Sequence, residues 1–292
     1  MATTKGIMGF VNLPGTVGPV RTTSFGLKAM QDIQSMDTID ATWDYTAYRY
    51  GPIRVEGDVS LPIPAGANIL FKVLDFVSER NPTTGRLQNN GVVTAAYDHT
   101  LAYNYLGCQA SNASFSINAE DAIDLSISFI GASRTRGSVA INADKQPKRV
   151  LTWDDVTFSA SIGGGTTVSG DTSCRVRSFN FDVNNNVTAF YGLCGDLFTI
   201  PDNIVAGKRE VSGSFEASWG DSLPFQDYAY NTNTQGPDTT TDSLTISVRN
   251  NGDVNFLGVI FNMEEISLTN DFFVGTQQWR AYGTDGTNAI DY

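Results

Sequence analysis

The sequence predicts a mainly β fold made of two tandem units, each a β-sandwich or partial barrel with a flanking α-helix. Three observations predict it: apolar residues alternate with polar ones over short stretches, turn residues bound those stretches, and two motifs recur in both halves. Only 17 % of the 292 residues are charged and 28 are glycine, whereas about 25 % charged is usual. Such a composition is typical of short strands joined by tight turns.

The repeat rests on two pairs of segments that occur in the same order. Gly51–Val59 and Gly207–Phe215 both read Gly-x-x-x-Val-x-Gly-x-apolar, with the central glycines 156 residues apart. Asn104–Gly107 resembles Asn255–Gly258 at a separation of 151 residues. Because two short matches keep one order and nearly one offset, we interpret them as a tandem duplication.

Each unit is expected to read strand, helix, long polar loop, hairpin. In the first unit these are a strand over 55–61, a helix from near Asn68 to before Pro82, the loop Asn81–Gly91, and strands Val92–Tyr97 and Leu101–Leu106. In the second unit they are a strand around Phe215, a weaker helix over Leu223–Tyr230, the loop Asn231–Thr241, and strands Leu244–Val248 and Val254–Ile260. Alternating apolar positions predict the strands, and one apolar helical face predicts the first helix.

Four further strands complete the prediction: Ile123–Ile130, Val156–Ile162, Cys174–Val183 with one slip interpreted as a bulge, and Glu265–Thr269. Gly163–Gly165 lacks the lysine of a phosphate-binding loop and reads as a hairpin turn, and Asn184–Asn186 also suits a turn. A polar stretch at Asn142–Pro147 suggests a boundary. The expected division is an N-terminal arm over 1–40, which packs on another element or subunit, a first unit over 41–147 and a second over 148–292.

The charge balance excludes some functions. Acidic residues outnumber basic ones, 31 against 19, for a formal net charge of −12. Tight DNA binding and docking on an anionic membrane both require clustered Lys and Arg. The acidity is also compatible with simple solubility.

The residues that metal binding and catalysis require are scarce. Three cysteines without a CxxC pair and the single His99 argue against a disulfide framework, a zinc site or a Ser-His triad. Neither a secretory signal nor a membrane-length apolar run is present. We therefore expect a soluble protein made in a reducing compartment, without a cofactor or metal.

Two further features bear on catalysis and sugar binding. The pairs Asp154-Asp155 and Glu264-Glu265 are read as neighbours on strands, which point to opposite faces, so they do not form a glycosidase dyad. Trp43 and Trp153 either pack against a strand edge or stack on a sugar. No catalytic constellation results, and the chain is not expected to be an enzyme.

The two long loops recur at the same place in both halves, and loops of this length are usually functional or disordered. They are either variable surface loops or contacts with a neighbouring subunit. The candidate contact residues are Asn81, Thr84, Arg86, Asn89, Asn231, Gln235, Asp238 and Thr241.

Four segments resemble the tail tube (major tail) proteins of tailed bacteriophages. They are Arg54–Pro62, Arg209–Trp219, Ser173–Asn186 with its Asn-rich end, and Ile200–Gly213. The resemblance is clearest over 150–265, weaker over 45–130 and absent before 40. Its motifs are patterns of strand, turn and glycine.

The resemblance implies a structural virion protein, assembled in the host cytoplasm, whose subunits join edge to edge into rings that stack into a tube for DNA passage. One domain per chain and six chains per ring are common in this family, so two units per chain imply a trimeric, pseudo-sixfold homo-oligomer. Expected partners are terminator, tape-measure and baseplate or tip proteins. DNA slides through without specific binding, past channel-lining acidic candidates Asp58, Glu210 and Glu216. The loops and the arm would contact the next ring.

Two other readings remain open. One is a different phage structural β protein, such as a capsid decoration or baseplate component. The other is a carbohydrate-binding β-sandwich module or hydrolase.

Overall fold

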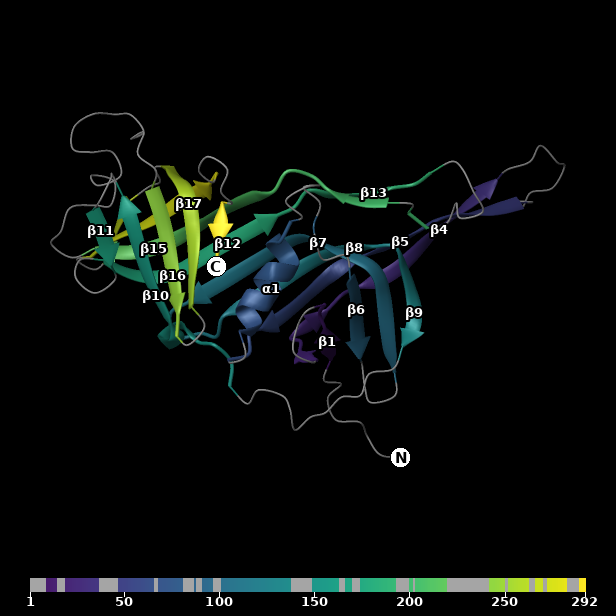
Figure 1. Cartoon of the computed structure of the whole chain (residues 1–292), viewed down its shortest axis with the longest axis horizontal. Coiled ribbons are helices and arrows are strands. Elements are labelled where there is room, and N and C mark those ends of the chain that lie inside the picture. The colour runs from purple at the N-terminus through teal and green to yellow at the C-terminus, as the bar shows by residue number, and fades with distance from the viewer. Residues whose placement is uncertain are drawn as a thin grey trace.

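The computed structural model describes residues 9–14, 19–36, 47–65, 68–80, 87, 91–96, 101–137, 149–162, 166–169, 174–192, 200–201, 203–219, 242–249, 252–262, 266–269, 272–282 and 289–292. Within these ranges the chain is mainly β, as the sequence predicts, and these ranges contain one α-helix (Figure 1).

The elements of the first half are β1 (Phe10–Asn12), β2 (Val20–Arg21), β3 (Ser24–Phe25), β4 (Lys28–Met36), β5 (Ala47–Pro62), α1 (Ile69–Ser78), β6 (Gly91–Ala96), β7 (Ala102–Asn118), β8 (Asp124–Gly131) and β9 (Ser133–Gly137). Those of the second half are the 3-10 turn η2 (Trp153–Asp155), β10 (Val156–Ile162), β11 (Thr166–Ser169), β12 (Cys174–Asn184), β13 (Val187–Phe190), β14 (Asn203–Ala206), β15 (Glu210–Trp219), β16 (Asp242–Val248), β17 (Gly252–Asn262), β18 (Ile266–Thr269), β19 (Phe272–Ala281) and β20 (Ile290–Asp291).

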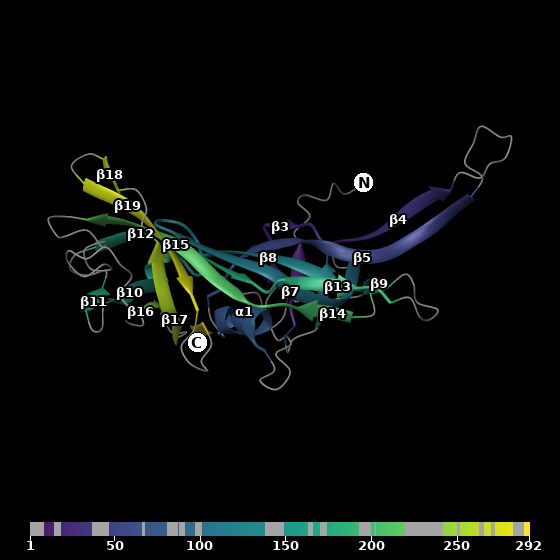
Figure 2. The ribbon, with the colours of Figure 1, turned by 90° about the horizontal axis from the view of Figure 1, so that it is seen from above.

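One large antiparallel sheet runs through both halves of the chain. Its strands follow the order β4, β5, β8, β7, β12, β15, β19 and β18. The pairing of β7 with β12 joins the two halves. In Figure 2 the large sheet extends along the length of the molecule, with α1 and the strands β16 and β17 to one side of it.

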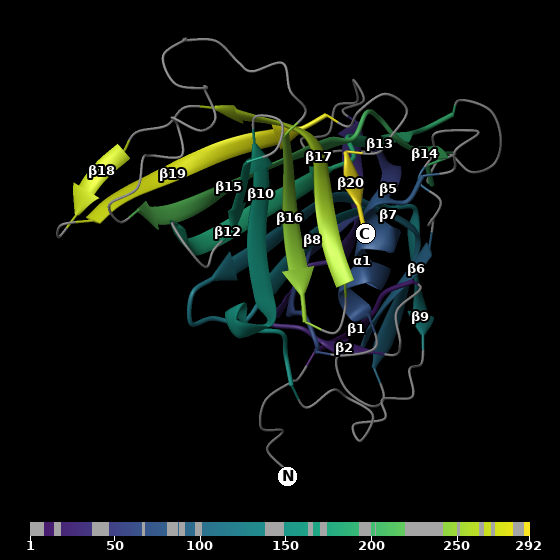
Figure 3. The ribbon, with the colours of Figure 1, turned by 60° about the vertical axis from the view of Figure 1, so that its left-hand side comes forward.

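A smaller sheet accompanies the large one in each half. The first has the order β2, β1, β6, β7 and β9, and the second has the order β11, β10, β16, β17 and β20 (Figure 3). The long strands β7 and β17 take part in both layers. Their first parts pair within the small sheet and their later parts within the large one.

The helix α1 forms where the sequence predicts it, because its apolar residues recur on one face. Ile69, Leu70, Val73, Leu74 and Val77 are all buried. They join a core cluster that includes residues of both halves. The second expected helix, over Leu223–Tyr230, lies outside the described residues.

Three segments differ from the expectation or extend it. The strand expected to end at Leu106 continues to Asn118, past a register shift between Ala110 and Asn112. Asp154 and Asp155 lie on the turn η2, so the reading of this pair as strand neighbours was wrong. Within the expected arm, β1 pairs with β6 and β2, and β3 and β4 pair with β5, so these described strands are part of the sheets.

The two hairpins that carry the second repeated motif have the same geometry. Thr94 Oγ1 lies 2.9 Å from Asn104 Oδ1. The residues 151 positions later in the sequence, Thr245 and Asn255, make the same contact at 2.9 Å. The glycine that closes the motif has a positive φ in both, 66° at Gly107 and 62° at Gly258.

Equivalent register is also found in the large sheet. Gly57 lies opposite Phe129 in the pairing of β5 with β8. Gly213 lies opposite Trp279 in the pairing of β15 with β19. Strands in corresponding positions of the two halves therefore pair with the same alignment.

Candidate functional site

The large sheet has one apolar and one polar face. Successive side chains on a strand point to opposite faces, and on β7 Ala113 and Phe115 are buried in the core while Ser114 and Ser116 lie on the other face. The same alternation on β12 buries Phe181. Short hydroxyl, amide and carboxylate side chains thus cover the face that turns away from the core.

Asp58 and Glu210 lie at the two ends of one row on this polar face. The row crosses five strands through directly opposite residues: Asp58 on β5, Ser128 on β8, Asn112 on β7, Asn184 on β12 and Glu210 on β15. These two candidates come from different halves of the chain.

Glu216, the third acidic candidate, occupies another row of the same face. It lies opposite Ser178 on β12 and Thr276 on β19, and Ser178 lies opposite Asn118 on β7. All three acidic residues predicted from the sequence therefore share one surface.

Asp124 and Asp182 also belong to this face, although neither is predicted from the sequence. Asp182 lies opposite Ser114 on one side and Ser212 on the other, and Asp124 lies opposite Ser116. The signal was present in the strand pattern, because each aspartate occupies a polar position of an alternating strand. Arg280, which lies opposite Ser212, is the one basic residue among the described members of these rows. On the same face outside these rows, Arg54 pairs with Glu56, and Lys28 lies opposite Glu56. The polar face is consequently rich in carboxylates.

Hydrogen bonds between neighbouring strands order part of the polar face. Ser128 Oγ donates to Asp58 Oδ1 at 2.6 Å, and the hydroxyls of Ser60 and Ser126 lie 3.2 Å apart. Partial burial, and to a lesser degree the charge of Asp121, raises the pKa of Asp124 above its ordinary value. A surface built this way presents hydroxyl and carboxylate oxygens from short side chains.

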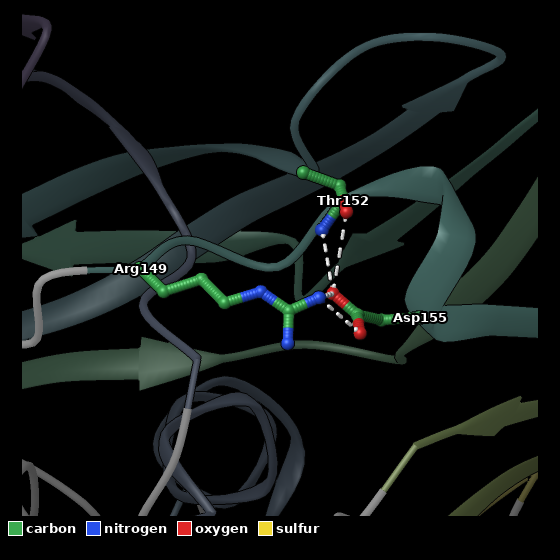
Figure 4. Close-up of polar contacts among 3 residues, drawn as sticks. All are labelled: Arg149, Thr152 and Asp155. Atoms are coloured by element: carbon green, nitrogen blue, oxygen red, sulfur yellow. Dashed lines mark hydrogen bonds and ion pairs between the residues drawn. The ribbon is translucent and has the colours of Figure 1, made fainter.

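A second polar cluster lies at the start of the second half and has a structural role (Figure 4). The Arg149 guanidinium donates to both carboxylate oxygens of Asp155, at 2.7 and 2.8 Å. The backbone N–H and the hydroxyl of Thr152 also reach Asp155 Oδ2, at 3.1 and 3.3 Å. Desolvation alone would raise the pKa of Asp155, but these hydrogen bonds and the Arg149 charge outweigh it and lower that pKa.

The segment that carries this cluster joins the two halves. The backbone N–H of Leu151 donates to Ile63, and the N–H of Ile123 donates to Leu151. The N–H of Arg249 donates to the carbonyl of Asp155. Asp155 therefore stabilises the segment through which Leu151 contacts the first half.

The loop candidates Asn81, Thr84, Arg86, Asn89, Asn231, Gln235, Asp238 and Thr241 lie outside the described residues. Trp43, His99 and the pair Glu264-Glu265 lie outside them as well. Of the first loop the structure describes Leu87 and Gly91, and Leu87 is buried against Val187 of β13 and Ile204 of β14. Trp153 lies on η2 with 46 % of its surface exposed.

Among the described residues, no cluster of three or more His, Cys, Asp or Glu side chains is placed to hold a metal ion. Burial raises the pKa of the Cys108 thiol to about 12, although a hydrogen bond from the Val93 backbone opposes this. A thiol held in its neutral form is a poor nucleophile. In the described part of the chain, no helix is both long enough and apolar enough to cross a bilayer.

Comparison with known proteins identifies one family. The family model of the phage tail tube protein matches residues 8–278. No curated protein matches the sequence.

Proposed function

Because this chain belongs to the phage tail tube protein family, we propose that three copies of it make each ring of the tube and that the polar face of the large sheet lines the channel. The chain is a structural protein of the phage tail, where stacked rings form the tube through which DNA passes. Each copy would contribute two tube-like units. We expect no catalytic activity and no cofactor.

The equivalent geometry of the two halves supports the trimer. The Thr94–Asn104 contact recurs at Thr245 and Asn255 with the same distance. Two equivalent units in one chain, each supplying one sector, give a pseudo-sixfold ring from three chains, whereas chains with one unit need six.

The same comparison supports a boundary between two units. We propose that this boundary lies within 138–148, close to the division into 41–147 and 148–292 expected from the sequence. We assign β1 to β4 to the first unit, because β1 pairs with β6 as β10 pairs with β16.

The carboxylates of the polar face support its role as the lining of the channel. Asp58, Glu210 and Glu216 share this face with Asp124 and Asp182. Negative charge repels DNA phosphates, and a wall without clustered Lys and Arg gives DNA no strong binding site from which it must dissociate. DNA would slide through without being held.

The loops would contact the next ring, and other tail proteins would bind the two ends of the tube. We assign Asn81–Gly91 and Asn231–Asp242 to contacts between rings, together with the residues before β1. The end partners would be terminator, tape-measure and baseplate or tip proteins. Assembly would take place in the host cytoplasm.

Electron microscopy of the purified protein tests the ring. We expect rings with three chains and hollow stacked tubes. Averaged images of a ring should show six similar sectors with exact threefold symmetry, because the two units of each chain are alike but not identical. Isolated trimers that never stack would favour a decoration or baseplate protein. A glycan-binding monomer at high concentration would overturn the proposal.

A deletion tests the assignment of the loops separately. Removing Gln235–Thr241 should leave the circular dichroism spectrum and the rings intact but prevent stacking. Normal tube assembly by this variant would exclude the loop from the contact between rings.

A further inference from the structure

The two halves of the chain meet at one strand pairing of defined register. The end of β7 pairs antiparallel with β12, with Asn118 opposite Ser178 and Phe115 opposite Phe181. This pairing joins the last large-sheet strand of the first half to the first large-sheet strand of the second. It therefore shows how consecutive units of this sequence fit together.

The segment formed by β3 and the start of β4 occupies in the first half the place that β12 occupies in the second. Phe25 lies opposite Val59, and Phe179 lies opposite Phe215. The two phenylalanines are 154 residues apart.

A close backbone approach marks the same correspondence. A Cβ atom at Gly57 would collide with the carbonyl oxygen of Gly26, and a Cβ atom at Gly213 would collide with that of Asn180. Gly26 and Asn180 are again 154 residues apart. Residues 24–27 are thus equivalent to residues 178–181.

The strand β18 occupies in the second half the place of the end of β7. Ser116 lies opposite Asp124 in the pairing of β7 with β8. Ser267 lies opposite Val274 in the pairing of β18 with β19. The separations are 151 residues for the serines and 150 for their partners, so Ile266–Thr269 is equivalent to Phe115–Asn118.

These two segments lie at opposite ends of the large sheet. In the described part of the chain, β5 is the only strand that pairs with β3 and β4, and β19 is the only one that pairs with β18. In Figure 2, β18 lies at one end of the long axis of the molecule, and β3 lies nearer its middle, where β4 begins. Edge strands of a sheet are templates for pairing with another chain.

We propose that β18 of one copy pairs with residues 24–27 of the next copy in the register of β7 with β12. Thr269 would then lie opposite Ser24, Leu268 opposite Phe25, Ser267 opposite Gly26 and Ile266 opposite Leu27. The partner is a second copy of this chain, and the contact is head-to-tail, as a closed ring requires. The inference rests on the proposed ring and adds the register that closes it.

A disulfide tests this register, because directly opposite residues in a ladder are close enough to be bridged. Ser24→Cys and Thr269→Cys are combined in a chain that carries Cys174→Ser and Cys194→Ser, while Cys108 is buried and stays. After oxidation of assembled rings, a non-reducing gel should show cross-linked dimers and trimers and nothing larger.

The matched control moves one cysteine by one residue. Thr23→Cys, also at an exposed position, replaces Ser24→Cys, and a shift by one residue turns the side chain to the other face of the sheet. This control should remain monomeric on the gel. Two results would show that the register is wrong while the ring itself is supported. In the first, rings form and the Thr23→Cys control cross-links. In the second, rings form and the chain with Ser24→Cys and Thr269→Cys does not cross-link. If the unmodified chain makes no rings, the proposed function fails and this inference fails with it.

Amide hydrogen exchange of the unmodified chain gives an independent measurement that needs no variant to fold. Residues 24–27 and 266–269 should exchange at least about 10-fold more slowly in rings than in the unassembled protein, because ladder hydrogen bonds protect amides. Equal exchange in rings and unassembled protein would overturn the proposed pairing.

Discussion

Gly57 and Gly213 hold the same place in two strands that are 156 residues apart in sequence. At each of them the neighbouring strand comes so close that a Cβ atom would collide with a backbone carbonyl oxygen, that of Gly26 or that of Asn180. Gly57 also has a φ of 145°, which residues with a side chain rarely adopt. The central glycine of the repeated motif is therefore required by close strand packing.

Replacing either glycine by alanine should destabilise the fold. A backbone cannot yield as the end of a flexible side chain can, so we expect Gly57→Ala and Gly213→Ala each to lower the free energy of unfolding by about 2 kcal/mol or more. Urea denaturation followed by tryptophan fluorescence measures this. Gly26→Ala is the matched control, because a Cβ atom there would meet its nearest neighbour at 3.5 Å, an ordinary contact. Equal losses in the control and the two variants would refute the explanation.

The strands with strong local alternation could be predicted from the sequence. Cys174–Val183 was expected as a strand with one slip, and the structure confirms both, since the register shifts between Val176 and Ser178. The second part of β7 was missed because Gly107 and the register shift between Ala110 and Asn112 interrupt its alternation.

The polar face could be predicted only in part. Acidic residues next to the repeated motifs were visible in the sequence, but their common surface depends on long-range pairing. Asp58 and Glu210 belong to the same row only because β8, β7 and β12 lie between their strands in that order. Local patterns do not determine which distant strands pair, and so Asp124 and Asp182 were not found.

Asp155 should make the stability of the protein depend on pH in the acidic range. Its folded-state pKa is lowered, so its carboxylate stabilises the fold above the unfolded pKa of about 3.9. This contribution is lost as the pH falls through the lower folded-state value. At pH 7, Asp155→Asn should cost about 1–3 kcal/mol, because it removes a buried charged partner of Arg149. At pH 3, the difference in the free energy of unfolding between the wild type and Asp155→Asn should be smaller than at pH 7.

Asp154→Asn provides the comparison for this acid dependence. Asp154 is the exposed neighbour of Asp155 on η2, and exposed substitutions usually change stability by no more than about 0.5 kcal/mol. Chemical denaturation at both pH values measures the two variants side by side. A loss in Asp155→Asn that is the same at pH 3 and pH 7 would contradict the assignment to its charge.

Cys108 should tolerate valine. Cys108 is fully buried and lies opposite Gly91. The equivalent residue, 151 positions later in the sequence, is Val259, which is also buried and lies opposite Asp242. Since the two side chains are similar in volume, Cys108→Val should change the free energy of unfolding by less than about 1.5 kcal/mol. Thermal melting tests this, and Cys108→Asp, which buries a charge in the same space, should fail to fold. A valine variant as damaged as the aspartate one would refute the equivalence.

Reversing the charge of the polar face should make the tube hold DNA. In a chain with Asp58→Lys, Glu210→Lys and Glu216→Lys, the added lysines would neutralise phosphates in a channel that otherwise repels them. Assembled tubes should then bind short duplex DNA at low ionic strength. The affinity should fall by on the order of 10-fold or more between about 50 and 200 mM salt, because binding releases counterions. Co-sedimentation of tubes with labelled DNA measures it, and the unmodified tubes should bind little at either concentration.

A second triple variant separates the channel from the overall charge. Glu120→Lys, Asp154→Lys and Asp253→Lys change the net charge by the same amount, at exposed positions outside the rows that contain Asp58, Glu210 and Glu216. If the polar face lines the channel, this variant binds DNA only on the outside of the tube, where added nuclease degrades it. DNA held by the first variant would be protected from nuclease along its length. Equal nuclease sensitivity of the DNA on both variants would show that the polar face of the large sheet does not line the channel.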